Sequence, residues 1–213
     1  MRYKAILFDM DGTLLDTLTD MADAVNHILS VHGWPLRTIE EVRAFVGNGA
    51  RRLMERAVPP EVTGGDFETV LTEYRDWYQA HNCVATAPYP GIPTLLAALA
   101  KAGIKTAVVS NKPDATTKTL AARFFPGLPA FGQRDDVPPK PSPDLVFRAL
   151  ETLGVDAAGA VYVGDSEVDV ATARNAGLPL AAVSWGFRGR QALAQAGAET
   201  IVDTAEQLLQ VLL

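Results

Sequence analysis

The sequence has little of several features that would point to other classes of protein. Its one cysteine, Cys83, excludes an internal disulfide bond and a cysteine-based zinc site within the chain, and is expected to be a small buried apolar residue. The apolar stretch before Asp9 is too short for a signal peptide. No run of about 18 apolar residues occurs, so no membrane span or membrane partner is expected. Basic residues are scattered, and the longest basic run is Arg51-Arg52. These absences predict a cytoplasmic protein.

What the sequence does contain is enough apolar material for a packed core. The chain has 213 residues, of which 48% are hydrophobic and 21% charged, and this composition excludes general disorder. The formal net charge of −6 weighs against a nucleic-acid partner, because binding to the phosphate backbone needs clustered lysine and arginine. The length suits either one large domain or a core domain with an insertion.

The C-terminal two-thirds of the chain alternates short apolar runs with helical patterns. The expected strands are 104–109, 160–163 and 180–183, each stopped by polar or glycine residues. One expected helix has Ser142 as its N-cap and Pro143 as its first residue, and ends at Gly154. A second expected helix spans about 168–176 and ends at Gly177. This order predicts an α/β fold with a Rossmann-like parallel sheet and helices on both faces.

A long helical segment interrupts this alternation. The first strand is expected at 3–8, and from about Leu15 to Ala87 the apolar spacing is helical, with almost no strand signal. Pro88-Tyr89-Pro90-Gly91 marks the return to the α/β pattern. The sequence therefore predicts an α/β core domain made of residues 1–14 and 89–213, with an inserted all-helical domain at 15–88.

Polar groups follow three of the expected strands. Asp9, Ser110 and Asp165 each come directly after an apolar run or its terminal glycine. Parallel strands end at the same edge of a sheet, so these three groups are expected to meet in one crevice. Asp11 lies two residues beyond Asp9, and Lys140 stands in a proline-rich loop that can hold its ammonium in the same crevice.

Such a cluster has a definite chemistry. Carboxylates that lie close together repel one another unless a cation joins them, and a set of oxygen ligands favours Mg²⁺. A cation, a lysine and a hydroxyl together form a site for a phosphate group. An ionised aspartate can attack phosphorus, and a second acid beside it can protonate the leaving oxygen. None of this needs histidine, and all three histidines lie in the helical insertion.

Four segments of the sequence resemble motifs of one family. Asp9-Met10-Asp11-Gly12-Thr13-Leu14 is similar to the first motif of the haloacid dehalogenase-like hydrolases. Ser110 resembles the second motif, Lys140 the third, and the segment 164–169 (Gly-Asp-Ser-Glu-Val-Asp) the fourth, all in the family's order. Ser110-Asn111-Lys112-Pro113, Pro90-Gly91 and the helical insertion resemble the phosphoglycolate phosphatase branch. One departure is that Ser110 replaces the family's common threonine; the hydroxyl is retained.

The resemblance implies a role for each matching residue. Asp9 would be the nucleophile that forms an aspartyl-phosphate, and Asp11 the general acid and base. The helical insertion would be a cap that closes over the substrate. Mg²⁺ would be held by Asp9, the main-chain carbonyl of Asp11 and Asp165, with Asp169 supporting from close by. The expected phosphate and substrate ligands are Ser110, Asn111, Lys140, Gly12, Thr13 and, in the cap, Arg51.

Other interpretations of single motifs are weaker. An EF-hand starting at Asp9 would need glycine where Leu14 stands. The segment Gly47-Asn48-Gly49 lacks the third glycine and the preceding strand of a dinucleotide-binding loop, and Arg51 can equally be a surface residue. The loop after Val183 is expected to be packed around Trp185.

The sequence thus predicts a Mg²⁺-dependent phosphatase for a small phosphorylated metabolite, most similar to phosphoglycolate phosphatase. Three activities of the same superfamily stay open: a pyrophosphatase, a sugar-phosphate phosphatase and a phosphoglucomutase-like enzyme. A remote alternative is a non-catalytic regulator that binds Mg²⁺ or phosphate. Both a monomer and a homodimer are compatible with the sequence.

Overall fold

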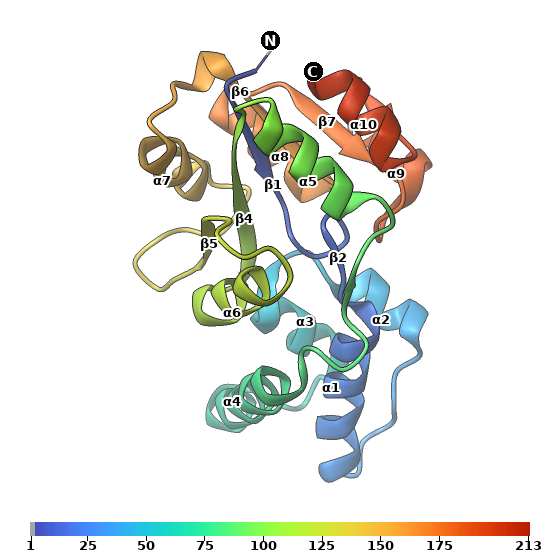
Figure 1. Cartoon of the computed structure of the whole chain (residues 1–213). Helices are drawn as coiled ribbons and strands as arrows, with labels where there is room; N and C mark the ends of the chain where they lie inside the picture. Colours follow the sequence, from blue (N-terminus) through green and yellow to red (C-terminus); the bar gives the residue numbers. More distant parts are fainter. Residues whose placement is uncertain (1–2) are drawn as a thin grey trace. The chain divides into compact units, whose positions relative to one another are not determined.

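The computed structural model describes residues 3–213, which form two compact units (Figure 1). One unit contains the chain up to Asp16 together with Pro88–Leu213, and the other contains Thr17–Ala87. The first is an α/β unit and the second is built from helices.

A six-stranded parallel sheet forms the centre of the α/β unit. Its strand order is β5-β4-β1-β6-β7-β8, and each neighbouring pair is parallel, which confirms the predicted α/β architecture. All four residues of β1 are completely buried, as expected for a central strand covered on both faces. The strands are β1 Ala5–Phe8, β4 Lys105–Pro113, β5 Ala130–Gln133, β6 Ala160–Gly164, β7 Leu180–Val183 and β8 Ile201–Val202.

Helices supply the apolar cover of this sheet. Alternate residues of β1, Ala5 and Leu7, belong to one core cluster with apolar residues of α7 and α8. Helices α5 and α10 pack against each other; α5 also packs against β4, and α10 against β7 and β8. The helices of this unit are α5 Ile92–Lys101, α6 Asp114–Phe124, α7 Asp144–Leu153, α8 Glu167–Ala176, α9 Gly189–Gln195 and α10 Ala205–Leu212, with a 3₁₀ turn at Ala157–Gly159.

Several predicted boundaries of strands differ from the observed ones. The first strand begins at Ala5 instead of Tyr3. Strand β4 does not stop at Val109 but continues to Pro113, because β5 pairs with both residues across a shift in register. Strands β5 and β8 were not predicted. Strand β5 (Ala-Phe-Gly-Gln) is not a continuous apolar run, and β8 has only two residues.

The predicted helix after Ser142 starts later than expected. It begins at Asp144, so Pro143 is the N-cap and not the first helical residue. The hydroxyl of Ser142 donates to the carboxylate of Asp144 and does not cap the backbone. The predicted ends at Gly154 and Gly177 are confirmed, and both glycines adopt the left-handed conformation that ends helices.

The second unit consists of α1 Leu18–Val31, α2 Ile39–Phe45, α3 Gly49–Ala57 and α4 Gly64–His81. Most of the apolar residues that give α1 and α4 their helical spacing are buried, namely Met21, Val25, Ile28, Leu29, Val70, Leu71, Tyr74 and Tyr78. Trp77 of α4 is half-buried, and its ring is stacked between those of His27 and His81. Short strands β2 (Leu15–Asp16) and β3 (Ala87–Pro88) form a two-stranded sheet that the sequence did not predict.

Two further sequence predictions concern the burial of the cysteine and the expected lack of a membrane span. Cys83 is half-buried, and its thiol donates to the side-chain oxygen of Asn82 at 3.1 Å, so the prediction of a buried apolar cysteine is wrong. Within residues 3–213, none of the helices is both long enough and apolar enough to cross a membrane.

Asp20 fixes the end of the helical unit. It lies in the first turn of α1 and is only 1% exposed. Its carboxylate accepts hydrogen bonds from three consecutive backbone N–H groups, those of Val84, Ala85 and Thr86, at 3.1, 2.8 and 2.9 Å. One side chain therefore provides the hydrogen-bond acceptors for three backbone N–H groups in a segment that is neither helix nor strand.

We expect Asp20→Ala to lower the free energy of unfolding by about 2–4 kcal/mol, because it leaves these three N–H groups without their acceptor. Urea unfolding followed by circular dichroism measures the change. Asp23→Ala, an exposed position on the same helix, is the matched control. Equal stability of the two variants would contradict the assignment.

Candidate active site

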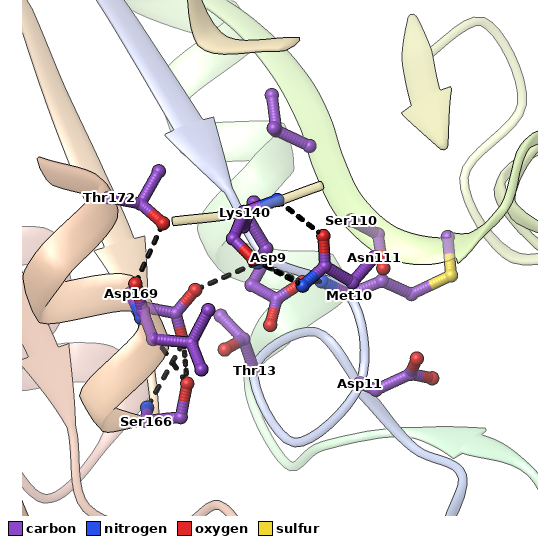
Figure 2. Close-up of polar contacts among 12 residues, drawn as sticks. Asp9, Met10, Asp11, Thr13, Ser110, Asn111, Lys140, Ser166, Asp169 and Thr172 are labelled. Atoms are coloured by element: carbon purple, nitrogen blue, oxygen red, sulfur yellow. Dashed lines mark hydrogen bonds and ion pairs between the residues drawn. The ribbon is translucent and has the colours of Figure 1, made fainter. Parts of the chain in front are cut away.

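The parallel register brings the predicted site residues together. Phe8, the last residue of β1, lies opposite Val108 of β4 and Val163 of β6. Asp9 therefore follows the central of three adjacent strands, and it is flanked by the C-terminal part of β4 and by the residues that follow β6. Figure 2 shows Asp9, Lys140 and Asp169 gathered at this edge.

Three carboxylates form the centre of the site. Ligand oxygens of Asp9, Asp165 and Asp169 all lie within 4.8 Å of one another. The three residues are 8%, 1% and 0% exposed. Buried carboxylates at such short separations need positive charge between them.

Lys140 supplies part of that charge. Its ammonium lies 2.9 Å from Oδ1 of Asp9 and 2.8 Å from Oδ1 of Asp169. Asn111 holds the loop in place, since its side-chain oxygen accepts from the backbone N–H of Lys140 at 2.7 Å and its amide donates to the Lys140 carbonyl at 3.0 Å. The predicted contact of Asn111 with phosphate stays a prediction, because here the amide binds the Lys140 backbone.

Asp169 is held by the start of α8. Its Oδ2 accepts from the backbone N–H groups of Asp165 at 3.2 Å and Ser166 at 3.0 Å, and from the Ser166 hydroxyl at 2.6 Å. Ser166 in turn caps the helix by accepting from the N–H of Asp169. Because Oδ1 contacts Lys140 and Oδ2 these three donors, Asp169 is placed to orient its neighbours.

Asp165 is enclosed by backbone. Its carboxylate accepts from the Thr13 hydroxyl at 3.0 Å and from the Phe187 N–H at 2.8 Å. A Cβ atom added at Gly12 or at Gly186 would lie 2.3 Å from Oδ2 of Asp165, and Gly12 also has a φ of +81°. Both positions therefore require glycine for this close approach. The contacts place Gly12 and Thr13 against Asp165, and their proposed contact with substrate stays a prediction.

The loop after β7 closes around this carboxylate. The indole N–H of Trp185 donates to the carbonyl of Thr13 at 3.1 Å. This bond anchors the loop that carries Gly186 and Phe187, as the sequence predicts for Trp185.

The electrostatics of the site favour a cation. Burial raises the pKa of Asp9 from 3.8 to about 7, and Lys140 opposes this rise only in part. Burial and the charge of Asp169 raise the pKa of Asp165 well above its usual value. Burial alone would lower the pKa of Lys140, but Asp169 and Asp9 raise it well above the usual value, so it stays charged.

Lys112 is a second buried ammonium, which the sequence analysis treated only as part of a motif. It is 6% exposed and lies 3.2 Å from Oδ1 of Asp11. Figure 2 shows the Asp11 side chain directed away from Asp9. When ionised, the carboxylates of Asp11 and the three clustered aspartates exceed the ammonium groups of Lys112 and Lys140 by two charges, which one divalent cation neutralises. The donor set, which consists of oxygen atoms, therefore fits Mg²⁺.

Of the remaining predicted site residues, Ser110 lies at the acidic cluster and Arg51 lies in the helical unit. Ser110 is 1% exposed at the site, and its hydroxyl accepts from the backbone N–H of Lys112 at 3.2 Å. Arg51 belongs to α3 of the helical unit, where it makes a two-pronged ion pair with Glu68 at 2.8 Å and lies over the ring of Phe67. Its role toward a substrate stays a prediction.

Comparison with known proteins agrees with this architecture. The family model for haloacid dehalogenase-like hydrolases matches residues 6–183. The chain is 36% identical to N-acetylmuramic acid 6-phosphate phosphatase of Pseudomonas aeruginosa, covering 100% of this chain and 96% of that protein. It is 34% identical to a phosphoglycolate phosphatase of Pseudomonas savastanoi pv. phaseolicola, covering 97% of this chain and 78% of the relative.

A solved structure shows the same fold along the whole chain. The crystal structure of a presumed phosphoglycolate phosphatase from Lactobacillus delbrueckii subsp. bulgaricus superposes with a TM-score of 0.95. The two sequences are 37% identical, and the match covers 100% of this chain and 99% of that one. The ordered motifs, the parallel sheet with its buried acidic edge and these full-length matches lead to one assignment: the chain belongs to the haloacid dehalogenase-like hydrolases and is a phosphatase of their phosphoglycolate phosphatase-like branch.

Proposed function

We propose that the protein hydrolyses a small phosphomonoester through a phosphorylated Asp9. The observation that carries this proposal is the ion pair of 2.9 Å between Asp9 and the buried ammonium of Lys140, beside the carboxylates of Asp165 and Asp169. This arrangement places a nucleophilic oxygen next to a fixed positive charge, which is what a transferring phosphoryl group requires.

The reaction proceeds in two transfers. An oxygen of Asp9 attacks phosphorus, the ester P–O bond breaks, and Asp11, which must first be protonated from solvent, donates that proton to the leaving alcohol oxygen. Asp11 then takes a proton from water, the water oxygen attacks phosphorus, and the bond between phosphorus and Asp9 breaks to release phosphate. Asp11 has to leave its ion pair with Lys112 to reach the leaving oxygen.

Mg²⁺ would be held by the side chains of Asp9 and Asp165 and by the main-chain carbonyl of Asp11. When bound, it supplies positive charge that neutralises the phosphoryl oxygens and the carboxylates. Asp169, whose two oxygens contact Lys140 and the start of α8, supports this set without direct ligation. Ser110, in the adjacent strand β4, is the proposed hydroxyl donor to the phosphoryl group.

The helical segment 15–88 is the proposed cap, and residues 1–14 and 89–213 the proposed catalytic core. The division of the chain into two compact units supports this assignment. Closure of a cap over the sheet edge would exclude bulk water, which otherwise competes with the acceptor for the phosphoryl group. We propose that Arg51, held by Glu68, presents its guanidinium to an anionic group of the substrate.

The substrate class follows from the relatives. Phosphoglycolate and N-acetylmuramic acid 6-phosphate are both phosphomonoesters of organic acids, and we propose the same class here. A phosphate-release screen with Mg²⁺ that contains these two compounds, pyrophosphate and hexose phosphates tests the assignment. Preference for pyrophosphate or a hexose phosphate would favour the alternative activities, and isomerisation without net phosphate release would indicate a mutase.

The first prediction from the proposed function concerns the nucleophile. Asp9→Asn should lower kcat by at least about 10³-fold, because an amide oxygen is a poor nucleophile toward phosphorus. The near-ultraviolet circular dichroism and melting temperature should stay those of a folded protein. Asp156→Asn, at an exposed position before β6, is the matched control and should retain activity. Turnover of Asp9→Asn at the wild-type rate would exclude Asp9 as the nucleophile.

A second prediction concerns the metal and pH. The pKa of Asp9 is 3.8 in the unfolded chain and about 7 in the folded one, so between these values the folded state binds more protons. Asp9 therefore makes the cation-free protein less stable as pH rises from about 4 to about 7, and Mg²⁺, which competes with the proton, should restore stability most above about pH 7.

Thermal unfolding with MgCl₂ or EDTA measures this effect. The increase in melting temperature caused by Mg²⁺ should be larger at about pH 8 than at about pH 5.5. Asp165→Asn should lose most of the response, and Asp156→Asn should keep it. A Mg²⁺ response that is stronger in acid, or phosphatase activity that persists in EDTA, would contradict the proposed metal site.

A further inference from the structure

Tyr162 is a buried residue of β6 that lies beneath Lys140. It is 0% exposed and belongs to the core cluster that contains residues of β1, β4 and α7. Its hydroxyl oxygen is 3.0 Å from the ammonium nitrogen of Lys140. The phenol ring faces the apolar core, whereas its oxygen reaches the charged site.

The hydrogen bonds of the Lys140 ammonium show that the Tyr162 hydroxyl is one of its three acceptors. A lysine ammonium has three N–H groups and no acceptor. Around Lys140 stand three acceptors, namely Asp9 Oδ1 at 2.9 Å, Asp169 Oδ1 at 2.8 Å and the Tyr162 hydroxyl at 3.0 Å. Each N–H group thus has one partner, and their directions fix the position of the nitrogen.

The hydroxyl of Tyr162 is oriented so that it accepts. Its own proton can go to the carbonyl oxygen of Val109 at 3.2 Å or to Asp169 Oδ1 at 3.3 Å. In either case a lone pair of the oxygen faces Lys140. The Val109 carbonyl belongs to β4, so the hydroxyl links two strands of the sheet to the ammonium.

The three acceptors are not equivalent. Asp169 is fixed by the start of α8, and Tyr162 by the core and by Val109. Asp9 is the acceptor that changes in the proposed reaction, because it becomes bonded to phosphorus. When that occurs, the N–H group that pointed at Asp9 needs a new acceptor, and the phosphoryl oxygens are in the right place to provide it.

We propose that Tyr162 is a positioning residue, which together with Asp169 holds the Lys140 ammonium so that its third N–H group passes from Asp9 to the phosphoryl oxygen. The proposal rests on the proposed function, because it assigns Lys140 to the transferring phosphoryl group. It adds Tyr162, a residue that takes no part in bond formation or bond breaking itself.

Tyr162→Phe tests the proposal, since it removes one oxygen and leaves the ring that fills the core. One N–H group of Lys140 then has no acceptor, and the ammonium turns away from the position that the phosphoryl group occupies during its transfer to Asp9. We expect kcat to fall about 10-fold while KM changes less than about 3-fold, because the lost interaction acts mainly in the transition state. Tyr3→Phe, a buried tyrosine before β1 at the opposite edge of the sheet, is the matched control and should change neither value.

A second readout does not depend on activity. In ¹H–¹⁵N spectra of the folded protein, the side-chain ammonium of a buried, fully hydrogen-bonded lysine exchanges slowly enough to be observed. The Lys140 resonance is identified by its loss in Lys140→Met, and it should shift or broaden in Tyr162→Phe and remain unchanged in Tyr3→Phe. The melting temperature shows whether each variant is folded.

The outcomes separate the two proposals. A lower kcat together with a changed Lys140 resonance supports the positioning role. An unchanged kcat, or a lower kcat with an unchanged resonance, overturns it. If the wild-type protein hydrolyses no ester in the panel, the proposed function fails, and the resonance then decides whether Tyr162 holds Lys140.

Discussion

The buried ammonium of Lys140 is the contact on which the rest of the site depends. Asp9 and Asp169 are both nearly inaccessible to water, and each would be costly to ionise without a nearby positive charge. Lys140 meets both at less than 3 Å and joins the end of β1 to the start of α8. Removing either sign of charge would leave the other without compensation in a medium where solvation is weak. The charges that the proposed chemistry uses are thus also the charges that compensate one another in this buried site.

The sequence predicts the parts of this arrangement that follow from periodicity. Apolar runs locate β1, β6 and β7, and parallel order brings Asp9 and Asp165 to one edge. The part that the sequence does not predict depends on contacts across the sheet. Tyr162 is an ordinary core residue in the pattern, and only the register of β6 beside β1 places its oxygen under Lys140. Strand β5 has the same length as β1 and β7, but its residues Ala-Phe-Gly-Gln do not form an apolar run, so the pattern does not indicate a strand there.

Side-chain pairing is the second feature that is invisible in the sequence. Asn111 belongs to a motif that resembles a phosphate-binding segment, yet its amide binds the backbone of Lys140, 29 positions along the chain. Arg51 is predicted as a candidate for substrate binding, and the structure adds its partner Glu68 on another helix. Lys112 and Asp11 likewise come from different strand ends. Such pairs are set by tertiary packing, which a linear pattern does not encode.

The glycines around the acidic cluster limit how this enzyme can change. A methyl group at Gly12 or Gly186 would overlap the carboxylate of Asp165, and one at Gly164 would lie 2.3 Å from the carboxyl carbon of Asp169. Backbone atoms therefore form this wall of the site, and almost any substitution there displaces a charged group. A library of variants that targets these positions would yield mostly inactive proteins. New substrate preferences have to arise in side chains that do not touch the acidic cluster, so the chemistry can be inherited unchanged while selectivity diverges.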